Sequence, residues 1–68
     1  MNTEERVLDY MQRFGSITQV QAFVDLGCTR LAEYIRRLKE NGVAIKAEWK
    51  TGKNRFGEET RWKEYRIA

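Results

Sequence analysis

Histidine is absent from these 68 residues, and cysteine occurs once, at Cys28. Without histidine there is no cysteine–histidine zinc site, and a single thiol cannot form an internal disulfide. A lone cysteine suits a reducing compartment, and we expect Cys28 to be a small buried residue. No apolar run approaches the roughly 20 residues of a membrane helix. The acidic, amphipathic start also lacks the basic residues and apolar core of a signal peptide. We therefore expect a cytoplasmic protein with no membrane partner, no metal and no other cofactor.

Residues that commonly carry catalysis are also scarce. The chain has one serine and two aspartates, and the aspartates lie far apart. Adjacent carboxylates at Glu4-Glu5 and Glu58-Glu59 fall in segments with an exposed pattern, and there is no glycine-rich loop of the kind that binds phosphate. These absences predict that the protein is not an enzyme and has no small-molecule substrate.

Charge is distributed unevenly along the chain. Residues 1–27 hold two basic and four acidic side chains, net −2, whereas residues 43–68 hold seven basic and four acidic ones, net +3. The segment between them has a net charge of +2. An acidic front and a basic back half are typical of a polyanion-binding protein, although a protein with mixed surface charge and no such role has the same composition.

Apolar residues at helical spacing predict two short helices in the first 27 residues. Asn2 or Thr3 can cap the first helix, and Gly15 supplies its left-handed end. Thr18 and Gln21 have the spacing of a capping box, which predicts the start of the second helix. The residues expected on the apolar sides are Val7, Met11 and Phe14 in the first helix, and Val20, Phe23, Val24 and Leu26 in the second.

A third helix is predicted directly behind a glycine turn. The connection from Gly27 to Thr29 is so short that the second and third helices must cross steeply, as in a helix-turn-helix. Thr29 is the expected cap of this helix, and Asn41-Gly42 is its expected end. Its apolar stripe consists of Leu31, Ile35 and Leu38.

The pattern changes to a period of two after this helix. Alternation from Val43 to Trp49 predicts a strand, residues 51–60 have the composition of a turn, and residues 61–67 predict a second strand. Ser16-Ile17 could add a short third strand. An antiparallel register can place five apolar residues on one buried face: Ile45, Ala47, Trp49, Tyr65 and Ile67.

This order of elements predicts an α+β winged helix-turn-helix. It consists of three helices followed by a two-stranded β-hairpin wing, and we assign residues 1–68 to one domain because the chain is short. The segments FGSITQVQAFVDLGCTRLAEYIRRLKENG and IKAEWKTGKNRFGEETRWKEYRI also carry a resemblance. Through their G-S-I-T, D-L-G, T-R-L-A and K-N-R-F-G motifs, residues 7–67 resemble the small winged helix-turn-helix proteins common in phages and prophages. The resemblance implies binding to DNA and names no target.

In such a fold, the third helix is expected to enter the major groove with its first turns nearest the bases. With the apolar stripe inward, Arg30 could pair with guanine and Glu33 could accept from cytosine, while Arg36 and Arg37 would meet phosphate. An alternative is a solvated face held by the charge pairs Glu33–Arg37 and Arg36–Glu40. The predicted residues of this DNA-binding helix are Thr29, Arg30, Glu33, Arg36 and Arg37.

The hairpin is predicted to bind phosphate or the minor groove, with Arg55 at its tip. Glu58 and Glu59 dilute its charge, and the alternative is a hairpin that charge merely keeps soluble. The predicted wing residues are Lys50, Lys53, Asn54, Arg55, Arg61 and Lys63.

Four aromatic residues of the hairpin have separate expected roles. Trp49 and Tyr65 are expected in the core, and Phe56 is expected to pin the turn. Alternation places Trp62 on the outer face, where it could lie under basic side chains, form a dimer contact or be turned inward by a bulge.

The sequence thus predicts a sequence-reading protein that binds double-stranded DNA, either a transcription regulator or an excisionase-like recombination accessory factor. One such domain covers little DNA, so a homodimer or a tandem assembly is expected on it. The competing hypothesis is a winged helix that binds another protein through the hairpin and the third helix. Acidic residues near the proposed DNA-binding face, Glu33 and Glu40 among them, favour this hypothesis because they repel phosphate.

Overall fold

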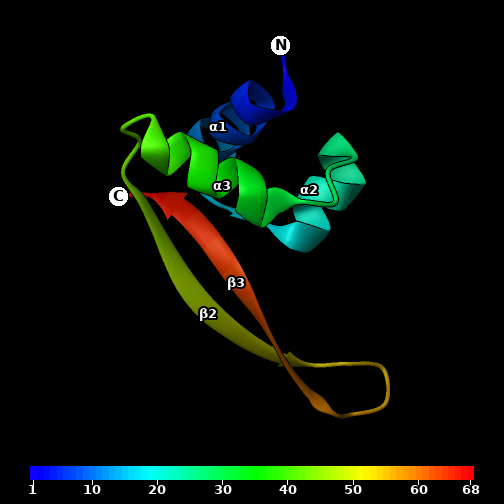
Figure 1. Ribbon diagram of the computed structural model, residues 1–68. Coiled ribbons are helices and arrows are strands. Elements are labelled where there is room, and N and C mark those ends of the chain that lie inside the picture. Colours follow the sequence, from blue (N-terminus) through cyan, green and yellow to red (C-terminus); the bar gives the residue numbers. More distant parts are fainter.

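In the computed structural model, which describes all residues from 1 to 68, three helices pack together and a long hairpin extends away from them (Figure 1). This architecture confirms the predicted α+β fold, and Ile17–Thr18 adds the short third strand to the sheet. None of the helices combines the length and the apolar character needed to cross a membrane. The elements are α1 (Thr3–Phe14), β1 (Ile17–Thr18), α2 (Gln19–Leu26), α3 (Leu31–Glu40), β2 (Ile45–Lys53) and β3 (Glu59–Ile67).

Local sequence signals set the ends of the first two helices. Asn2 caps α1, because its side-chain oxygen accepts from the Glu5 N–H at 2.8 Å. The capping box at the start of α2 is complete, with both bonds between Thr18 and Gln21 present. Gly15 and Gly27 end the two helices at φ values of 87° and 67°, a left-handed conformation that glycine adopts without strain.

The start of α3 differs from the prediction that Thr29 caps it. Arg30 occupies the cap position and its side chain makes no capping bond. Instead, Gln19 reaches across from α2: its Oε1 accepts from the Leu31 N–H at 3.1 Å, and its Nε2 donates to the Cys28 carbonyl at 2.8 Å. A side chain distant in sequence therefore satisfies the amide expected to pair with Thr29, and it ties the two helices of the helix-turn-helix together.

The core lies between the helices and the base of the sheet. The stripe of α3 is buried as predicted, and so is Cys28. Val20, Phe23 and Val24 of α2 were expected to face inward, but they are exposed. Only Ala22 of α2 is buried, and Val20 and Val24 lie two residues to either side of it, which is about 200° around a helix. The buried apolar residues are Val7, Met11, Ile17, Ala22, Cys28, Leu31, Ile35 and Leu38.

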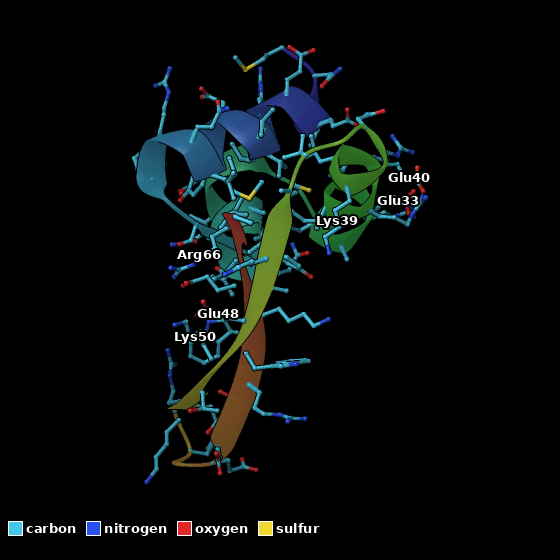
Figure 2. All side chains as sticks on the ribbon, turned by 90° about the vertical axis from the view of Figure 1, so that its left-hand side faces the viewer. Glu33, Lys39, Glu40, Glu48, Lys50 and Arg66 are labelled. Carbon is cyan, nitrogen blue, oxygen red and sulfur yellow. The ribbon has the colours of Figure 1, made fainter.

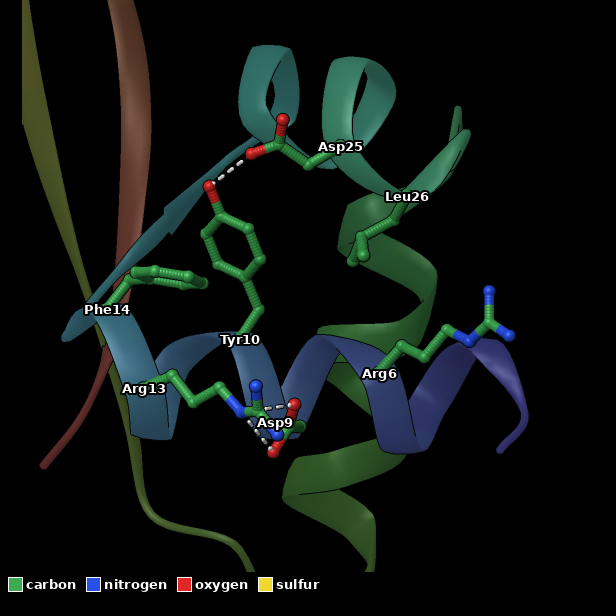
Figure 3. Close-up of a pocket in the computed structure, with 7 residues that line it drawn as sticks. All are labelled: Arg6, Asp9, Tyr10, Arg13, Phe14, Asp25 and Leu26. Carbon is green, nitrogen blue, oxygen red and sulfur yellow. Dashed lines mark hydrogen bonds and ion pairs between the residues drawn. The ribbon is translucent and has the colours of Figure 1, made fainter.

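Phe14 also departs from the prediction, because it is largely exposed and packs outside the core. Its ring lies 4.7 Å from that of Tyr10, at the end of α1 (Figure 3). The Tyr10 hydroxyl donates to Asp25 at 2.5 Å, which joins α1 to α2. This hydrogen bond, aided by burial and by the carboxylate charge, raises the pKa of Tyr10.

The sheet has the order β1-β3-β2 and the predicted antiparallel register. Ile45 pairs with Ile67 and Ala47 pairs with Tyr65, so these residues share a face with Trp49. The predicted burial of all five was wrong, because the hairpin extends well beyond the helices (Figure 1). Ile45 and Tyr65 are partly buried against the core, whereas Ala47, Trp49 and Ile67 are exposed.

The turn of the hairpin is shorter than predicted, because the strands continue to Lys53 and resume at Glu59. Asn54 organises this turn: its side-chain oxygen accepts from the N–H groups of Phe56 and Glu58 at 2.9 and 3.0 Å. The prediction that Phe56 pins the turn was therefore wrong, and its ring is 83% exposed.

Candidate nucleic-acid interface

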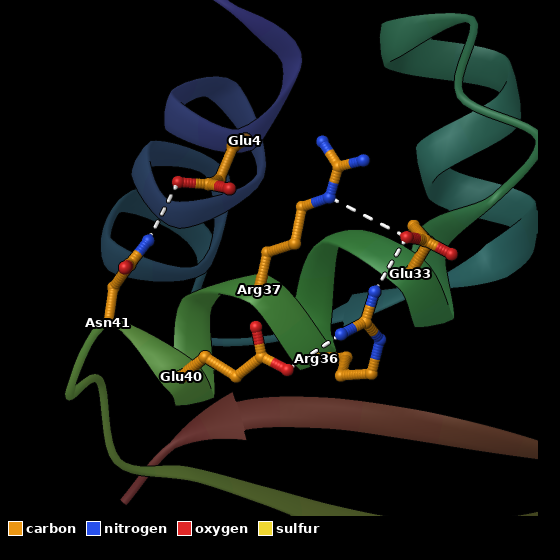
Figure 4. Close-up of polar contacts among 6 residues, drawn as sticks. All are labelled: Glu4, Glu33, Arg36, Arg37, Glu40 and Asn41. Carbon is orange, nitrogen blue, oxygen red and sulfur yellow. Dashed lines mark hydrogen bonds and ion pairs between the residues drawn. The ribbon is translucent and has the colours of Figure 1, made fainter.

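The buried stripe of α3 fixes which residues of this helix face solvent. Leu31, Ile35 and Leu38 are each at most 3% exposed, so the opposite face is held outward. Figure 4 shows that this face has two sides, with Arg37 pointing toward α1 and α2 and Arg36 pointing toward the strands. The arginines predicted to meet phosphate therefore leave α3 in different directions.

An ion-pair network runs along the exposed face of α3. Arg36 bonds Glu33 at 2.8 Å and Glu40 at 2.6 Å, while Arg37 Nε lies 3.6 Å from Glu33. Both charge pairs that the sequence predicts are thus present. The hydrogen bond from Arg36, with the charges of the neighbouring arginines, lowers the pKa of Glu33. Hydrogen bonds to Glu33 and Glu40 raise the pKa of Arg36. In the free protein, these arginines are already partly neutralised.

Arg30, directly before α3, differs from Arg36 and Arg37 because it forms no ion pair. It is exposed at the start of α3, where Thr29 and Arg30 line a hollow of about 140 Å³ with Thr3 and Tyr34. The guanidinium of Arg37 lies 5.5 Å from the centre of the Tyr34 ring. Arg30 is therefore the unpaired cation at the end of α3 nearest to the helix-turn-helix linker.

The hairpin has two sides of different chemistry. Figure 2 shows Glu48, Lys50 and Arg66 on the side away from α3, which we call the back side. Because side chains alternate along a strand, the odd-numbered residues lie on the opposite side, toward α3. We call this the front side. Its exposed residues in β2 and β3 include Trp49, Thr51, Lys53, Glu59, Arg61 and Lys63.

On the back side, two of the three strand cations, Lys50 and Arg66, are paired with carboxylates, whereas the exposed Lys46 forms no ion pair. Lys50 lies 3.3 Å from Glu48 and 4.0 Å from Glu64, and Arg66 lies 2.8 Å from Glu64 and 3.8 Å from Glu48. The hydrogen bond to Glu64, with the Glu48 charge, raises the pKa of Arg66. Lys50 is one of the predicted wing residues, and its charge is engaged here, away from the other predicted cations.

The front side carries cations without carboxylate partners. Arg61 and Lys63 form no ion pair, and instead lie 5.1 and 5.2 Å from the centre of the Trp49 ring. Glu59, opposite Lys53 near the tip, is the one acidic residue in the strands on this side. The prediction that Trp49 belongs to the core was wrong: it is 59% exposed, since it lies farther along the hairpin than the helices reach.

Trp62 lies on the outer face, as simple alternation predicts, and the continuous pairing of β2 with β3 contains no bulge. Its ring packs over Gly52, where an added Cβ would lie only 2.9 Å from it. A hollow of about 420 Å³ separates Trp62 from α2 and is also lined by Val20. The side chain is 39% exposed and lies away from the front-side cations.

The remaining wing residues lie at the tip. Lys53 and Arg55 are exposed and form no ion pair, whereas the side-chain oxygen of Asn54 is used within the turn. Figure 4 shows Arg36 directed from α3 toward the strands, and the register places Arg61 and Lys63 on the side of the hairpin that faces α3. The structure leaves Lys50 on the back side and Arg37 on the far side of α3.

The surface between α3 and the front side of the hairpin forms an angle, which we call the concave side. Two residues on this concave side were not predicted as site residues. Lys39 projects from α3 toward the hairpin (Figure 2), and Trp49 lies on the hairpin itself. Lys39 lies three residues after Arg36, so helical spacing alone could have grouped them. For Trp49, the parity of the strand indicated the side, but the length of the hairpin beyond the helices carried no comparable signal.

A family model described as a winged helix-turn-helix domain matches residues 2–68. The chain belongs to this winged helix-turn-helix family. No curated protein and no solved structure matches it. A winged helix-turn-helix domain suggests DNA binding, and in this family member the helix after the turn is α3 and the wing is the β2–β3 hairpin.

Proposed function

We propose that this protein is a sequence-reading, double-stranded DNA-binding protein of the phage and prophage type, acting as a transcription regulator or a recombination accessory factor. One observation carries the proposal: cations of α3 and unpaired cations of the hairpin border the same concave side of the molecule. A duplex in that angle would meet α3 and the wing together.

The residues of α3 divide between base and backbone contacts. Arg30, exposed and unpaired, is suited to bidentate contact with guanine. Glu33 is suited to accept from a cytosine amino group once Arg36, on the hairpin side of α3, and Arg37, on its other side, turn to the phosphates that border the two edges of the major groove. That exchange is favourable because an arginine gives up a solvent-exposed carboxylate for a more highly charged polyanion. Thr29 lies one residue before Arg30 and faces solvent next to it.

The wing supplies contacts that position the protein without reading sequence. Lys53 and Arg55 at the tip are placed to enter the minor groove or to meet phosphate. With Arg61 and Lys63 on the front side, we expect four to six phosphate contacts and a slope of about −4 to −5 for log K against log salt. Because a single domain buries only about 600–1,000 Å² on DNA, we propose a homodimer or tandem assembly at the target.

An electrophoretic shift with random duplex at low salt tests DNA binding, and selection from a random duplex pool tests sequence reading. We expect retardation that weakens steeply with salt, followed by enrichment of one motif. A palindromic motif indicates a dimer, and direct repeats indicate a tandem array. No retardation at micromolar protein contradicts the proposal.

A second candidate function is a protein-interaction module, and the outer face of α2 favours it. Val20, Phe23 and Val24 are 59–71% exposed and adjacent on one helix face, which gives an apolar patch without charges. If protein binding is the main role, replacing these three residues with serine abolishes the activity of the protein in the cell and leaves any duplex affinity unchanged. If DNA binding is the main role, Arg61→Ala and Lys63→Ala abolish that cellular activity instead.

A further inference from the structure

We propose that Trp49, Arg61 and Lys63 form a platform for one sugar-phosphate strand of duplex DNA, an inference that rests on the proposed DNA binding. The indole would lie against deoxyribose, and the two cations would meet the phosphates on either side. None of the DNA-contacting roles predicted from the sequence includes Trp49.

The geometry of the three side chains is that of a preformed surface. Trp49 lies opposite Lys63 in the β2–β3 register, and Arg61 is two residues away on the same side of β3. The guanidinium of Arg61 is 5.1 Å and the Lys63 ammonium 5.2 Å from the Trp49 ring centre. At these distances the ring attracts both cations, which restricts the freedom of two long side chains before any ligand arrives.

The exposure of Trp49 is not explained by packing. The other tryptophan, Trp62, covers Gly52 and is 39% exposed, whereas Trp49 lies outside the buried core cluster and is 59% exposed. A large apolar ring in water is unfavourable by about 25 cal/mol for each Å² that a partner could cover. A polyanionic partner that covers this ring would remove the indole from water and would also supply negative charge to its two neighbouring cations.

The spacing of the cations fits a nucleic-acid backbone. Residues two apart on a strand are separated by about 7 Å, a distance similar to that between successive phosphates of one DNA strand. No carboxylate pairs with either cation, in contrast with Lys50 and Arg66 on the back side. Both cations of the platform are therefore available, whereas on the back side only Lys46 is unpaired.

A duplex backbone fits better than an unstacked base. Two cations already occupy positions over the Trp49 ring, and the residue lies within a paired strand and not in the turn at the tip. Stacking of a base would have to displace those cations. The deoxyribose edge of a strand can instead lie against the indole while phosphates approach the cations from outside.

Two single-tryptophan variants test the platform. Trp62→Phe retains Trp49 as the only tryptophan, and Trp49→Phe retains Trp62. Each is titrated with fluorescein-labelled duplex, so that anisotropy reports binding and tryptophan emission reports the environment of the ring. We expect the emission of Trp49 to change along the anisotropy curve and the emission of Trp62 to stay constant. We also expect Trp49→Ala to weaken binding several-fold and Trp49→Phe to restore most of it.

The outcomes separate this inference from the proposed function. Duplex binding by anisotropy with constant Trp49 emission, and with Trp49→Ala equal to the unchanged protein, overturns the platform and leaves DNA binding intact. No anisotropy change with the unchanged protein overturns both. Tighter binding of single strands than of duplex also overturns the platform, since it indicates base stacking. In the Trp62→Phe background, Arg61→Ala should alter Trp49 emission before DNA is added and reduce the salt slope by about 1.

Discussion

The front and back sides of the hairpin carry similar numbers of cations in different electrostatic settings. On the back side, Lys50 and Arg66 are paired with Glu48 and Glu64. On the front side, Arg61 and Lys63 lie against an aromatic ring and have no carboxylate partner. Counting basic residues along the wing sequence does not distinguish these two groups. Their register and pairing do, and the comparison identifies which cations are available to a polyanion.

The largest effect is expected from removing the front-side cations. Arg61→Ala with Lys63→Ala eliminates two proposed phosphate contacts, which reduces the salt slope by about 1.8 and the duplex affinity at about 0.1 M salt on the order of 50-fold. The matched control, Lys50→Ala with Arg66→Ala, removes the same charge from the back side. Anisotropy titrations at several salt concentrations measure both. Equal losses for the two pairs would end the distinction between the sides.

The next largest effect concerns sequence reading by α3. With a selected target, Arg30→Ala should reduce the preference over random duplex by about 1–3 kcal/mol, because a bidentate base contact is lost. Arg37→Ala is the matched control, and it should weaken both duplexes alike because its contact is to phosphate. Competition binding with the two duplexes gives the ratio. An unchanged preference in Arg30→Ala shows that this residue does not read the base.

A smaller effect tests whether pairing or placement makes the back side inactive. Glu48→Gln with Glu64→Gln frees Lys50 and Arg66, and it should cost about 1 kcal/mol per pair, because the Lys50–Glu48 pair is exposed to solvent and the Arg66–Glu64 pair is partly buried. If the back-side cations lie too far from DNA, duplex affinity rises only slightly, through the change in net charge. A steeper salt slope would show that the freed cations reach DNA and that only their ion pairs had prevented this contact.

The smallest effect is expected at a residue on neither side of the hairpin. Tyr10→Phe removes the hydrogen bond to Asp25 and should lower the free energy of unfolding by about 0.5 kcal/mol, the low end for such bonds, because the pair is exposed. The folded protein raises the pKa of Tyr10, so this contribution is present below about pH 10 and is lost as pH rises through the raised value. Urea unfolding at pH 8 and 11 should show a steeper decline for the unchanged protein than for Tyr10→Phe, and parallel declines would contradict this.

Features that depend on neighbouring residues could be predicted from the sequence. The Asn2 cap, the box at Thr18 and Gln21, and the two glycine ends need only local hydrogen bonds and backbone freedom. The stripe of α3 followed from helical spacing, and the strand register followed from alternation. These rules were sufficient for the fold and for the outward direction of the proposed DNA-binding helix.

Features that depend on distant parts of the chain could not be predicted. Gln19, and not Thr29, accepts from the first α3 amide, that of Leu31, and Gln19 belongs to another helix. Trp49 was misplaced because alternation gives the side of a strand and says nothing about where the covering layer ends. The apolar side of α2 was only partly predicted, because Ala22 is its one buried residue and Leu26 packs against the core, whereas Val20, Phe23 and Val24 are exposed.

Cysteine protection tests most directly whether DNA lies against the front side. Thr51→Cys and Glu48→Cys each add one exposed thiol, on the front and back sides respectively, while Cys28 is buried and reacts slowly. Alkylation rates are measured with and without saturating duplex. We predict that duplex slows modification at position 51 many-fold and leaves position 48 unchanged. Protection at position 48 with none at position 51 would contradict the account.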